Sequence, residues 1–237
     1  MTYQFDPVPY QSHDPHYTNL RPTFRARMCR ITLLAVIATD LLLIPMQFLA
    51  LWVTNTVKGG ARPGPEMLAA AFALCGIGLL SMAAGITCIV FICMWVHRAN
   101  VAARGTGGEG MEFTPGWAVG WFFIPFANLV MPHRVMQEIW RASNPQRPAG
   151  MEWRNDANSG LVSSWWFTWI GSGFMSVTGS VMSKLAEDSP ALAQAGTVLQ
   201  AAALVVACVA SVLLIKVIGT ITNNLEIRIQ SLTLRAE

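Results

Sequence analysis

Long apolar runs alternate with short polar connections along most of the chain. The runs cover residues 31–53, 67–96, 161–182 and 191–218, and each holds 22 or more residues. An α-helix rises about 1.5 Å per residue, so roughly 20 apolar residues cross the hydrocarbon core of a bilayer. The pattern therefore predicts an all-α membrane protein with four transmembrane helices, of which the second is long enough to tilt.

A fifth apolar run, residues 117–131, is shorter than the others. Its notable aromatic, polar and proline positions, together with the proline directly after it, are Trp117, Trp121, Pro125, Asn128 and Pro132. A helix of this length covers only about 22 Å, and proline removes a backbone donor and obstructs a continuous helix. The run therefore predicts either a re-entrant or interfacial hairpin with Pro125 at its bend, or a short true span.

The distribution of lysine and arginine distinguishes these two topologies, because cytoplasmic loops of membrane proteins carry an excess of both. With four spans and both termini cytoplasmic, 13 of the 16 Lys and Arg residues lie inside, and only Lys58, Arg62 and Lys184 lie outside. A fifth span would leave seven inside and nine outside. The count favours four spans with a hairpin that enters from the cytoplasmic side.

Amphipathic segments flank the hairpin. Between residues 133 and 142 apolar and polar side chains fall on opposite helical faces, which predicts a helix on the membrane surface within a hairpin unit of residues 113–142. Residues 219–237 continue an apolar stripe, which predicts an amphipathic C-terminal helix that packs on the hairpin, the membrane or a partner. Aromatic anchors at the membrane interface are predicted at Trp52, Trp95, Trp165, Trp166 and Trp169.

Composition agrees with a membrane protein, because 53% of the residues are hydrophobic and only 12% are charged. Residues 1–30 are rich in polar residues and proline and end in a basic cluster, which predicts a disordered cytoplasmic tail. Basic residues adjoin the apolar runs, so the net charge of +3 indicates orientation in the bilayer and not a nucleic-acid partner. The five cysteines form no Cys-x-x-Cys pair, so neither a disulfide framework nor a zinc site is predicted.

Asp40 is the most unusual polar residue, because it lies ten residues, about 15 Å, into the first span. An acid at that depth costs a few kcal/mol and usually faces a bundle interior or a water-filled cavity. Asp40 is therefore a candidate proton or cation site, or a protonated packing group. Pro45, five residues further on, favours a kink that would open a cavity beside it.

Other candidates lie where the second span meets the cytoplasm and in the hairpin. Arg98 is placed to reach lipid phosphate, alone or in an anionic-lipid pocket with Arg134. His97 and His133 lack the further ligands that a zinc or haem site needs, so no metal or cofactor is predicted. Asn128 needs hydrogen-bond partners in an apolar setting, which predicts either capping of the broken backbone near the proline or solute binding.

Several of these positions belong to one extended motif. The sequence runs Trp-x-His-Arg-Ala-Asn at residues 95–100, Pro-Gly-Trp-Ala-Val-Gly-Trp-Phe-Phe-Ile-Pro-Phe-Ala-Asn-Leu-Val-x-Pro at 115–132, and Glu-Ile-Trp-Arg-Ala-Ser at 138–143. This motif resembles the signature of the bacterial DUF4328 membrane family, a domain of unknown function. The resemblance implies a multi-pass protein of the bacterial cytoplasmic membrane, and it implies no activity. The polar and proline positions of the motif are candidate site residues, namely Arg98, Asn100, Pro125, Asn128 and Pro132.

Two classes of function remain. No serine, cysteine or histidine arrangement predicts nucleophilic catalysis, and no paired carboxylates predict acid and base chemistry, so an enzyme is not expected. The scarcity of polar residues within the spans favours an accessory or scaffold subunit that binds membrane lipids, a larger membrane complex or a second copy of the chain. The alternative is a small transporter or channel that uses Asp40, Asn128 and the broken hairpin as a polar pathway.

Overall fold

Helices make up the whole of the regular structure that the computed structural model describes, which covers residues 21–60, 62, 64–147, 152–186 and 189–234. The four long helices are α2 (Thr23–Lys58), α3 (Pro65–Gly105), α6 (Gly160–Leu185) and α7 (Pro190–Leu234). The short elements between α3 and α6 are α4 (Pro115–Gly120), η1 (Ala127–Leu129), α5 (Met131–Ala142) and η2 (Trp153–Asn155).

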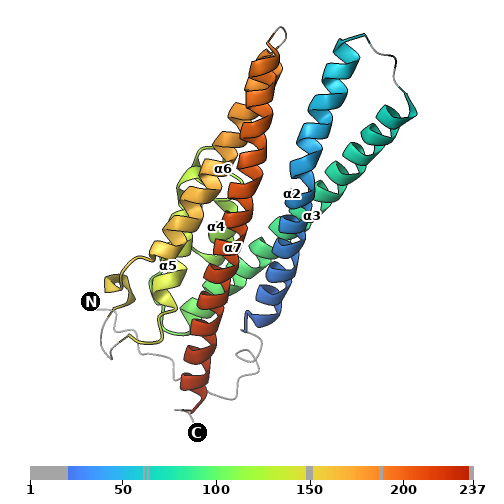
Figure 1. Cartoon of the computed structure of the whole chain (residues 1–237). Coiled ribbons are helices and arrows are strands. Elements are labelled where there is room, and N and C mark those ends of the chain that lie inside the picture. Colours follow the sequence, from blue (N-terminus) through green and yellow to red (C-terminus); the bar gives the residue numbers. More distant parts are fainter. Residues whose placement is uncertain (1–20, 61, 63, 148–151, 187–188, 235–237) are drawn as a thin grey trace.

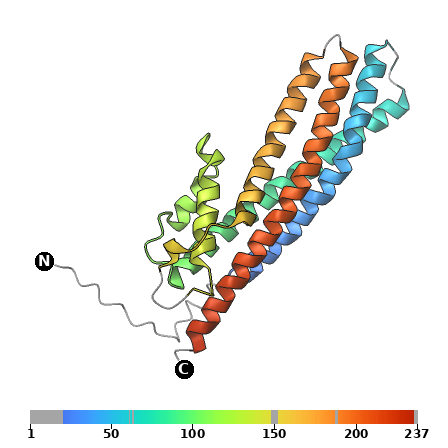
Figure 2. The ribbon, with the colours of Figure 1, turned by 60° about the vertical axis from the view of Figure 1, so that its left-hand side comes forward.

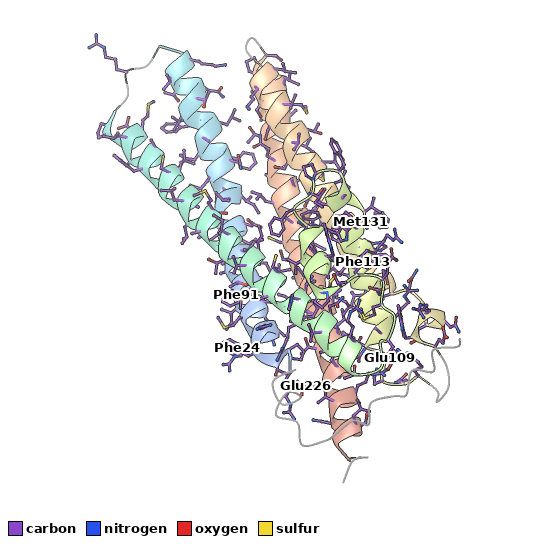
Figure 3. The ribbon with its side chains drawn as sticks, turned by 180° about the vertical axis from the view of Figure 1, so that it is seen from behind. Phe24, Phe91, Glu109, Phe113, Met131 and Glu226 are labelled. Carbon is purple, nitrogen blue, oxygen red and sulfur yellow. The ribbon has the colours of Figure 1, made fainter. Side chains whose placement is uncertain are left out.

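The long helices form two antiparallel pairs, α2 with α3 and α6 with α7, and α7 also packs along α2 (Figure 1). We call the end where α2 begins and α7 ends the proximal end, and the opposite end, with the α2–α3 and α6–α7 connections, the distal end. α3 runs obliquely, from beside α4 and α7 at the proximal end to beside α2 alone at the distal end (Figures 1 and 3). The short helices lie against the proximal half of the bundle (Figure 2).

Three of the described helices are long and apolar enough to cross a membrane, namely Thr23–Lys58, Pro65–Gly105 and Pro190–Leu232. They contain the first, second and fourth predicted spans. The third predicted span lies in α6, which has 26 residues and runs beside α7. α6 is not among the three described helices that are apolar enough to mark a span by length and composition.

The first span begins earlier than its apolar run indicates. α2 starts at Thr23, so Arg25, Arg27 and Arg30 lie on its first turns and not in a disordered tail. The rest of the predicted tail, residues 1–20, lies outside the described residues. Pro45 stands inside α2, which continues past it to Lys58.

α6 and α7 cross at two glycines that permit a close approach. A Cβ atom on Gly179 would lie 2.7 Å from the carbonyl oxygen of Gly196 and 2.8 Å from Cγ of Gln200. A Cβ atom on Gly196 would in turn lie 2.7 Å from the carbonyl oxygen of Gly179. Beside this contact, Nε2 of Gln200 donates a hydrogen bond of 3.1 Å to Oγ of Ser183. Small residues that bring helix backbones together are typical of membrane helix pairs.

The core lies toward the proximal end, where α3, α5 and α7 meet. Its largest fully buried apolar side chains are Trp95, Met136, Ile139, Ile218, Ile221 and Leu225. Nε1 of Trp95 donates a hydrogen bond of 3.0 Å to Oγ1 of Thr222, which joins α3 to α7. The apolar stripe that continues past the last predicted span therefore packs inside the protein. It belongs to one uninterrupted helix, α7, and not to a separate C-terminal helix.

α5 is the amphipathic helix predicted between residues 133 and 142, but the prediction that it lies on the membrane surface is wrong. Its apolar side chains Val135, Met136 and Ile139 are buried in the core of the protein. On another face, Gln137 and Glu138 are each only 3% exposed. Connecting segments cover these polar side chains, so α5 is an internal element.

The predicted aromatic anchors separate into two groups. Trp52 and Trp169 are exposed, as residues at a membrane interface should be. Trp95, Trp165 and Trp166 are buried and therefore serve packing within the protein. Nε1 of Trp166 donates a hydrogen bond of 3.2 Å to the carbonyl oxygen of Leu129, which fastens the hairpin to α6.

Candidate functional site

The segment from Pro115 to Ala142 forms a hairpin beside the bundle. Met131, at the start of α5, lies further from the proximal end than Phe113, which precedes α4 (Figure 3). Between α4 and α5 the chain turns at Pro125, as the sequence predicts, and Phe126 adopts a φ of 63°. A non-glycine residue rarely adopts this left-handed backbone, so the turn is sharply constrained.

The hairpin tip, which we define as residues 121–130, exposes mainly apolar side chains. Phe126 is 85% exposed, and Phe123 and Val130 are also exposed. On α4, the ring of the exposed Trp117 lies 5.3 Å from that of Trp121. Such a surface suits contact with lipid or with an apolar partner and offers few groups for chemistry.

Polar side chains of α3 and α5 fix the connection between α3 and α4 from two sides. Nδ2 of Asn100 donates a hydrogen bond of 3.0 Å to the carbonyl oxygen of Phe113. The guanidinium of Arg104 donates to the carbonyl oxygens of Met111 at 2.7 Å and Phe113 at 2.8 Å. From α5, the carboxylate of Glu138 accepts the backbone N–H of Phe113 at 3.2 Å. We call Asn100, Arg104 and Glu138 the polar clamp.

Glu138 is the buried ionisable member of the clamp on α5. It also accepts the backbone N–H of Glu112, so both carboxylate oxygens are used. Burial raises the pKa of the Glu138 carboxyl, whereas the two backbone hydrogen bonds and the positive charge of Arg104 oppose that shift. The carboxylate therefore serves as an anchor for backbone and not as an open acid or base.

Gln137, the neighbour of Glu138, holds the start of α6 in the same manner. Its Oε1 accepts the backbone N–H of Ser159 at 2.7 Å, and its Nε2 donates to the carbonyl oxygen of Ser159 at 2.9 Å. Nε2 of His133 lies 3.1 Å from Oγ of Ser163 in this network, and burial lowers the pKa of His133. Because Ser159 caps α6, α5 fixes the position of that helix.

A cavity of about 190 Å³ lies against the polar face of α5. Its charged lining residues are Glu112, Arg134, Glu138 and Arg141. Arg134 forms an ion pair of 3.3 Å with Glu112, and the guanidinium of Arg141 lies 5.6 Å from the ring centre of Trp153. Two positive and two negative side chains balance each other, so the cavity does not select a charged ligand.

The other polar candidates at the end of α3 have different surroundings. His97 is exposed, and the described residues contain no group of ligands that would hold a metal ion. Arg98 lies close enough to Arg25 of α2 for the two charges to repel. Arg134, by contrast, pairs with Glu112. The lipid pocket between Arg98 and Arg134 that the sequence suggests stays a prediction.

The two last motif candidates also differ from each other. The Asn128 side chain is partly exposed and forms no hydrogen bond with the described residues, so its predicted capping role is not formed. Pro132 lies in the first turn of α5 and is buried. Proline is well suited to this position, because the N–H it lacks would have no partner within the helix.

Asp40 faces the interior of the bundle, 9% exposed and near Cys208 of α7. Toward the distal end a cavity of about 360 Å³ opens between α2 and the α6–α7 pair, with Gln47, Asn55 and Gln200 among its lining residues. Gln47 follows Asp40 by two helical turns, so the two share one face of α2. A polar cavity thus lies further along the helix face that carries the buried acid.

Arg104, Gln137 and Glu138 are the site residues that the sequence pattern did not identify. Arg104 follows Asn100 by four residues, and its Nε donates to Oδ1 of Asn100 at 3.0 Å. That spacing places both residues on one helix face and is the signal that would have linked them. Gln137 carried no such signal, because its partner Ser159 lies in a distant, irregular segment.

Comparison with known families identifies one match. The family model described as "Domain of unknown function (DUF4328)" matches residues 64–223. No curated protein and no solved structure matches the chain. The matched range includes α3, the polar clamp, the hairpin, α6 and most of α7. The chain belongs to the DUF4328 family.

Proposed function

We propose that the protein is a non-catalytic accessory or scaffold subunit that binds a larger complex in the bacterial cytoplasmic membrane. The observation that carries this proposal is the apolar outer face of α3. One set of its exposed side chains recurs at alternating spacings of four and three residues, namely Leu68, Phe72, Cys75, Leu79, Met82 and Ile86. Leu80, Ile89 and Val90 of α3 are exposed as well. This is the spacing of a seam that packs against a second helix.

Small residues beside the seam favour a helical partner over lipid alone. A Cβ atom added to Gly76, Gly78 or Gly85 would meet no atom within 4 Å. Glycine residues on the surface of a helix let the backbone of another helix approach closely within a membrane. The partner on this seam is a transmembrane helix of another protein or of a second copy of the chain.

The use of the buried polar side chains supports a non-catalytic role. Asn100, Gln137 and Glu138 direct their hydrogen bonds to backbone groups of connecting segments. An enzyme needs polar groups that converge on space for a substrate. These side chains instead build a rigid proximal unit that holds the hairpin.

We test the partner proposal by site-specific photo-cross-linking in native membranes. A cross-linker at Phe72, on the α3 seam, should yield one discrete protein adduct, and mild detergent should recover the same protein in stoichiometric amount. Phe174 of α6 is similarly exposed but lies outside the seam, so a cross-linker there should attach to lipid. If both positions gave lipid adducts alone, the subunit proposal would be wrong.

The proposed topology has four spans, with α6 as the third, both termini cytoplasmic and the hairpin entering from that side. The charge distribution supports it. Cysteines replacing Lys58 and Gln146, both exposed, should respond differently to a membrane-impermeant thiol reagent on intact cells. The Lys58→Cys site should react from outside, and the Gln146→Cys site only after permeabilisation. Reaction of both from outside would instead make residues 117–131 a true span.

A small transporter is the second candidate, and the polar cavity on the Asp40 face of α2 favours it. In liposomes the purified protein would then carry protons or cations, and Asp40→Asn should abolish that flux without changing the yield of folded protein. Glu66→Gln, which changes an exposed acid at the start of α3, is the matched control. Equal flux in the wild type and Asp40→Asn would exclude Asp40 from the pathway.

A further inference from the structure

A separate cavity of about 350 Å³ lies between α2 and α7 at the proximal end. It is a different site from the hairpin and from the distal cavity. Arg27 and Arg30 of α2 stand on one side of it, and Ile215, Ile218 and Asn223 of α7 stand on the other. Both helices that form it are among those able to cross a membrane.

The cavity carries an excess of positive charge. Arg27 and Arg30 are three residues apart, so they share a helix face, and both are exposed. Neither forms a hydrogen bond or an ion pair with the described residues. The acidic lining residue, Glu226, already has Arg21 at 3.9 Å. The lining thus holds two guanidinium groups and one carboxylate, and Arg21 pairs with that carboxylate from outside the lining, which favours an anionic ligand.

Along α7 the cavity lining changes from charged to apolar toward the distal end. On α7, Glu226 lies nearest the proximal end, and Ile218 and Ile215 follow at eight and eleven residues toward the distal end. At about 1.5 Å per residue, the apolar wall begins roughly 12 Å from the carboxylate. On α2, the two arginines directly precede the apolar run that starts at residue 31. α2 and α7 are antiparallel, and Arg21 pairs with Glu226 while Asp40 lies near Cys208, so Arg27 and Arg30 lie level with residues 218–221 of α7 and Ile215 lies deeper. The basic side chains thus stand at the edge of the apolar run, with an apolar wall toward the distal end. This arrangement suits a phospholipid, whose charged headgroup lies at the interface and whose acyl chains lie deeper.

We propose that this cavity binds one anionic phospholipid of the leaflet at the proximal end, with its phosphate between Arg27 and Arg30. An acyl chain of the lipid lies along Ile215 and Ile218. The inference rests on the proposed membrane orientation, but it does not depend on the partner helix at α3. Basic pockets between transmembrane helices on the cytoplasmic side are a recognised way to hold such headgroups. The bound lipid would bridge α2 and α7, which form most of the contact between the two helix pairs.

The test compares lipid retention by the full chain after purification in mild detergent. We would incubate the protein with vesicles of phosphatidylglycerol or of phosphatidylcholine, repurify it, and count bound lipids by native mass spectrometry. The wild type should retain about one phosphatidylglycerol and little phosphatidylcholine. Arg27→Gln with Arg30→Gln should weaken retention about 30-fold, because each basic side chain at a membrane surface contributes about 5-fold.

A matched control removes the same charge elsewhere. Arg62→Gln with Lys184→Gln alters two basic residues near the distal end, where neither lines this cavity, and should retain lipid as the wild type does. Arg27→Lys with Arg30→Lys keeps the charge and should restore much of the binding, which separates recognition from misfolding. Equal retention by the glutamine variant and the wild type would overturn the proposal.

Two further outcomes also bear on the ligand. Complete displacement of the lipid by millimolar inorganic phosphate would assign the site to a free anion and overturn the lipid proposal. Equal retention of both lipids would show that the arginines do not select charge and would overturn it as well. Neither result affects cross-linking at Phe72, so this inference and the proposed function fail separately.

Discussion

Gly179→Leu is expected to prevent the close packing of α6 against α7 and to abolish most recovery of folded protein. Even the first side-chain carbon would lie 2.7 Å from the carbonyl oxygen of Gly196. That neighbour is backbone, so it cannot move aside by changing a rotamer. Overpacking of this kind costs about 3 kcal/mol or more where the surroundings cannot adjust. The helix pair would have to separate along much of its length.

A control for this substitution lies on the same helix. A Cβ atom on Gly173 would meet no atom within 4 Å, so Gly173→Leu adds the same apolar volume without a clash. Size-exclusion profiles and thermal unfolding in one detergent would compare the two variants. Similar yield and unfolding temperature for both would show that the crossing at Gly179 does not need a glycine.

Glu138→Ala is expected to release the connection between α3 and α4 and to destabilise the proximal unit. The substitution removes the acceptor for the backbone N–H groups of Glu112 and Phe113. A buried donor without a partner costs about 1 to 3 kcal/mol, so the loss for the two donors is about 2 to 6 kcal/mol. Hydrogen exchange should accelerate at residues 106–114, and the unfolding temperature should fall. Hydrogen exchange of the backbone amides in the hairpin tip should change less.

Glu112→Ala is the matched control, because it removes a neighbouring carboxylate whose side chain is 62% exposed and pairs only with Arg134 at the surface. An exposed ion pair contributes about 1 kcal/mol or less. If Glu112→Ala destabilised the protein as much as Glu138→Ala, the clamp would not be the source of the effect.

The pH dependence gives an independent check on Glu138. Its pKa is raised in the folded protein, so the folded state holds the proton to a higher pH than the unfolded chain does. The stabilisation by Glu138 relative to Glu138→Gln should therefore be largest at acid pH and decline as the pH rises through the folded pKa. Thermal unfolding of both proteins across that range would measure the difference. A constant difference would contradict the shift.

Much of the fold follows from the sequence. Length and apolarity alone identify α2, α3 and α7, because a membrane helix satisfies its own backbone and needs only apolar side chains outside. The bend at Pro125 follows from the missing backbone donor of proline. α6 is less evident, because it is not among the described helices that length and composition mark as able to cross a membrane.

The candidate site was less predictable. A helix on the membrane surface would turn its polar face to water, and this is what the pattern of α5 predicts. A helical projection shows which side chains share a face but not what covers that face. Gln137 and Glu138 are covered by connecting segments that have no periodic pattern. The burial of Trp165 and Trp166 could not be predicted from the sequence for a similar reason. A tryptophan at the end of a span can lie in the membrane interface or pack beneath a hairpin, and its position in the sequence is the same in both cases.

α5 has only 12 residues, yet it binds the backbone of two connecting segments, one after α3 and one before α6. Glu138 accepts a hydrogen bond from the backbone of the segment that follows α3, and Gln137 donates one to the backbone of Ser159 at the start of α6. A force applied to the hairpin tip, by a thicker bilayer or by a protein that pulls on it, would reach both helix pairs through these bonds. α5 thus links the two helix pairs, which cannot tilt independently while the hydrogen bonds of Glu138 and Gln137 persist.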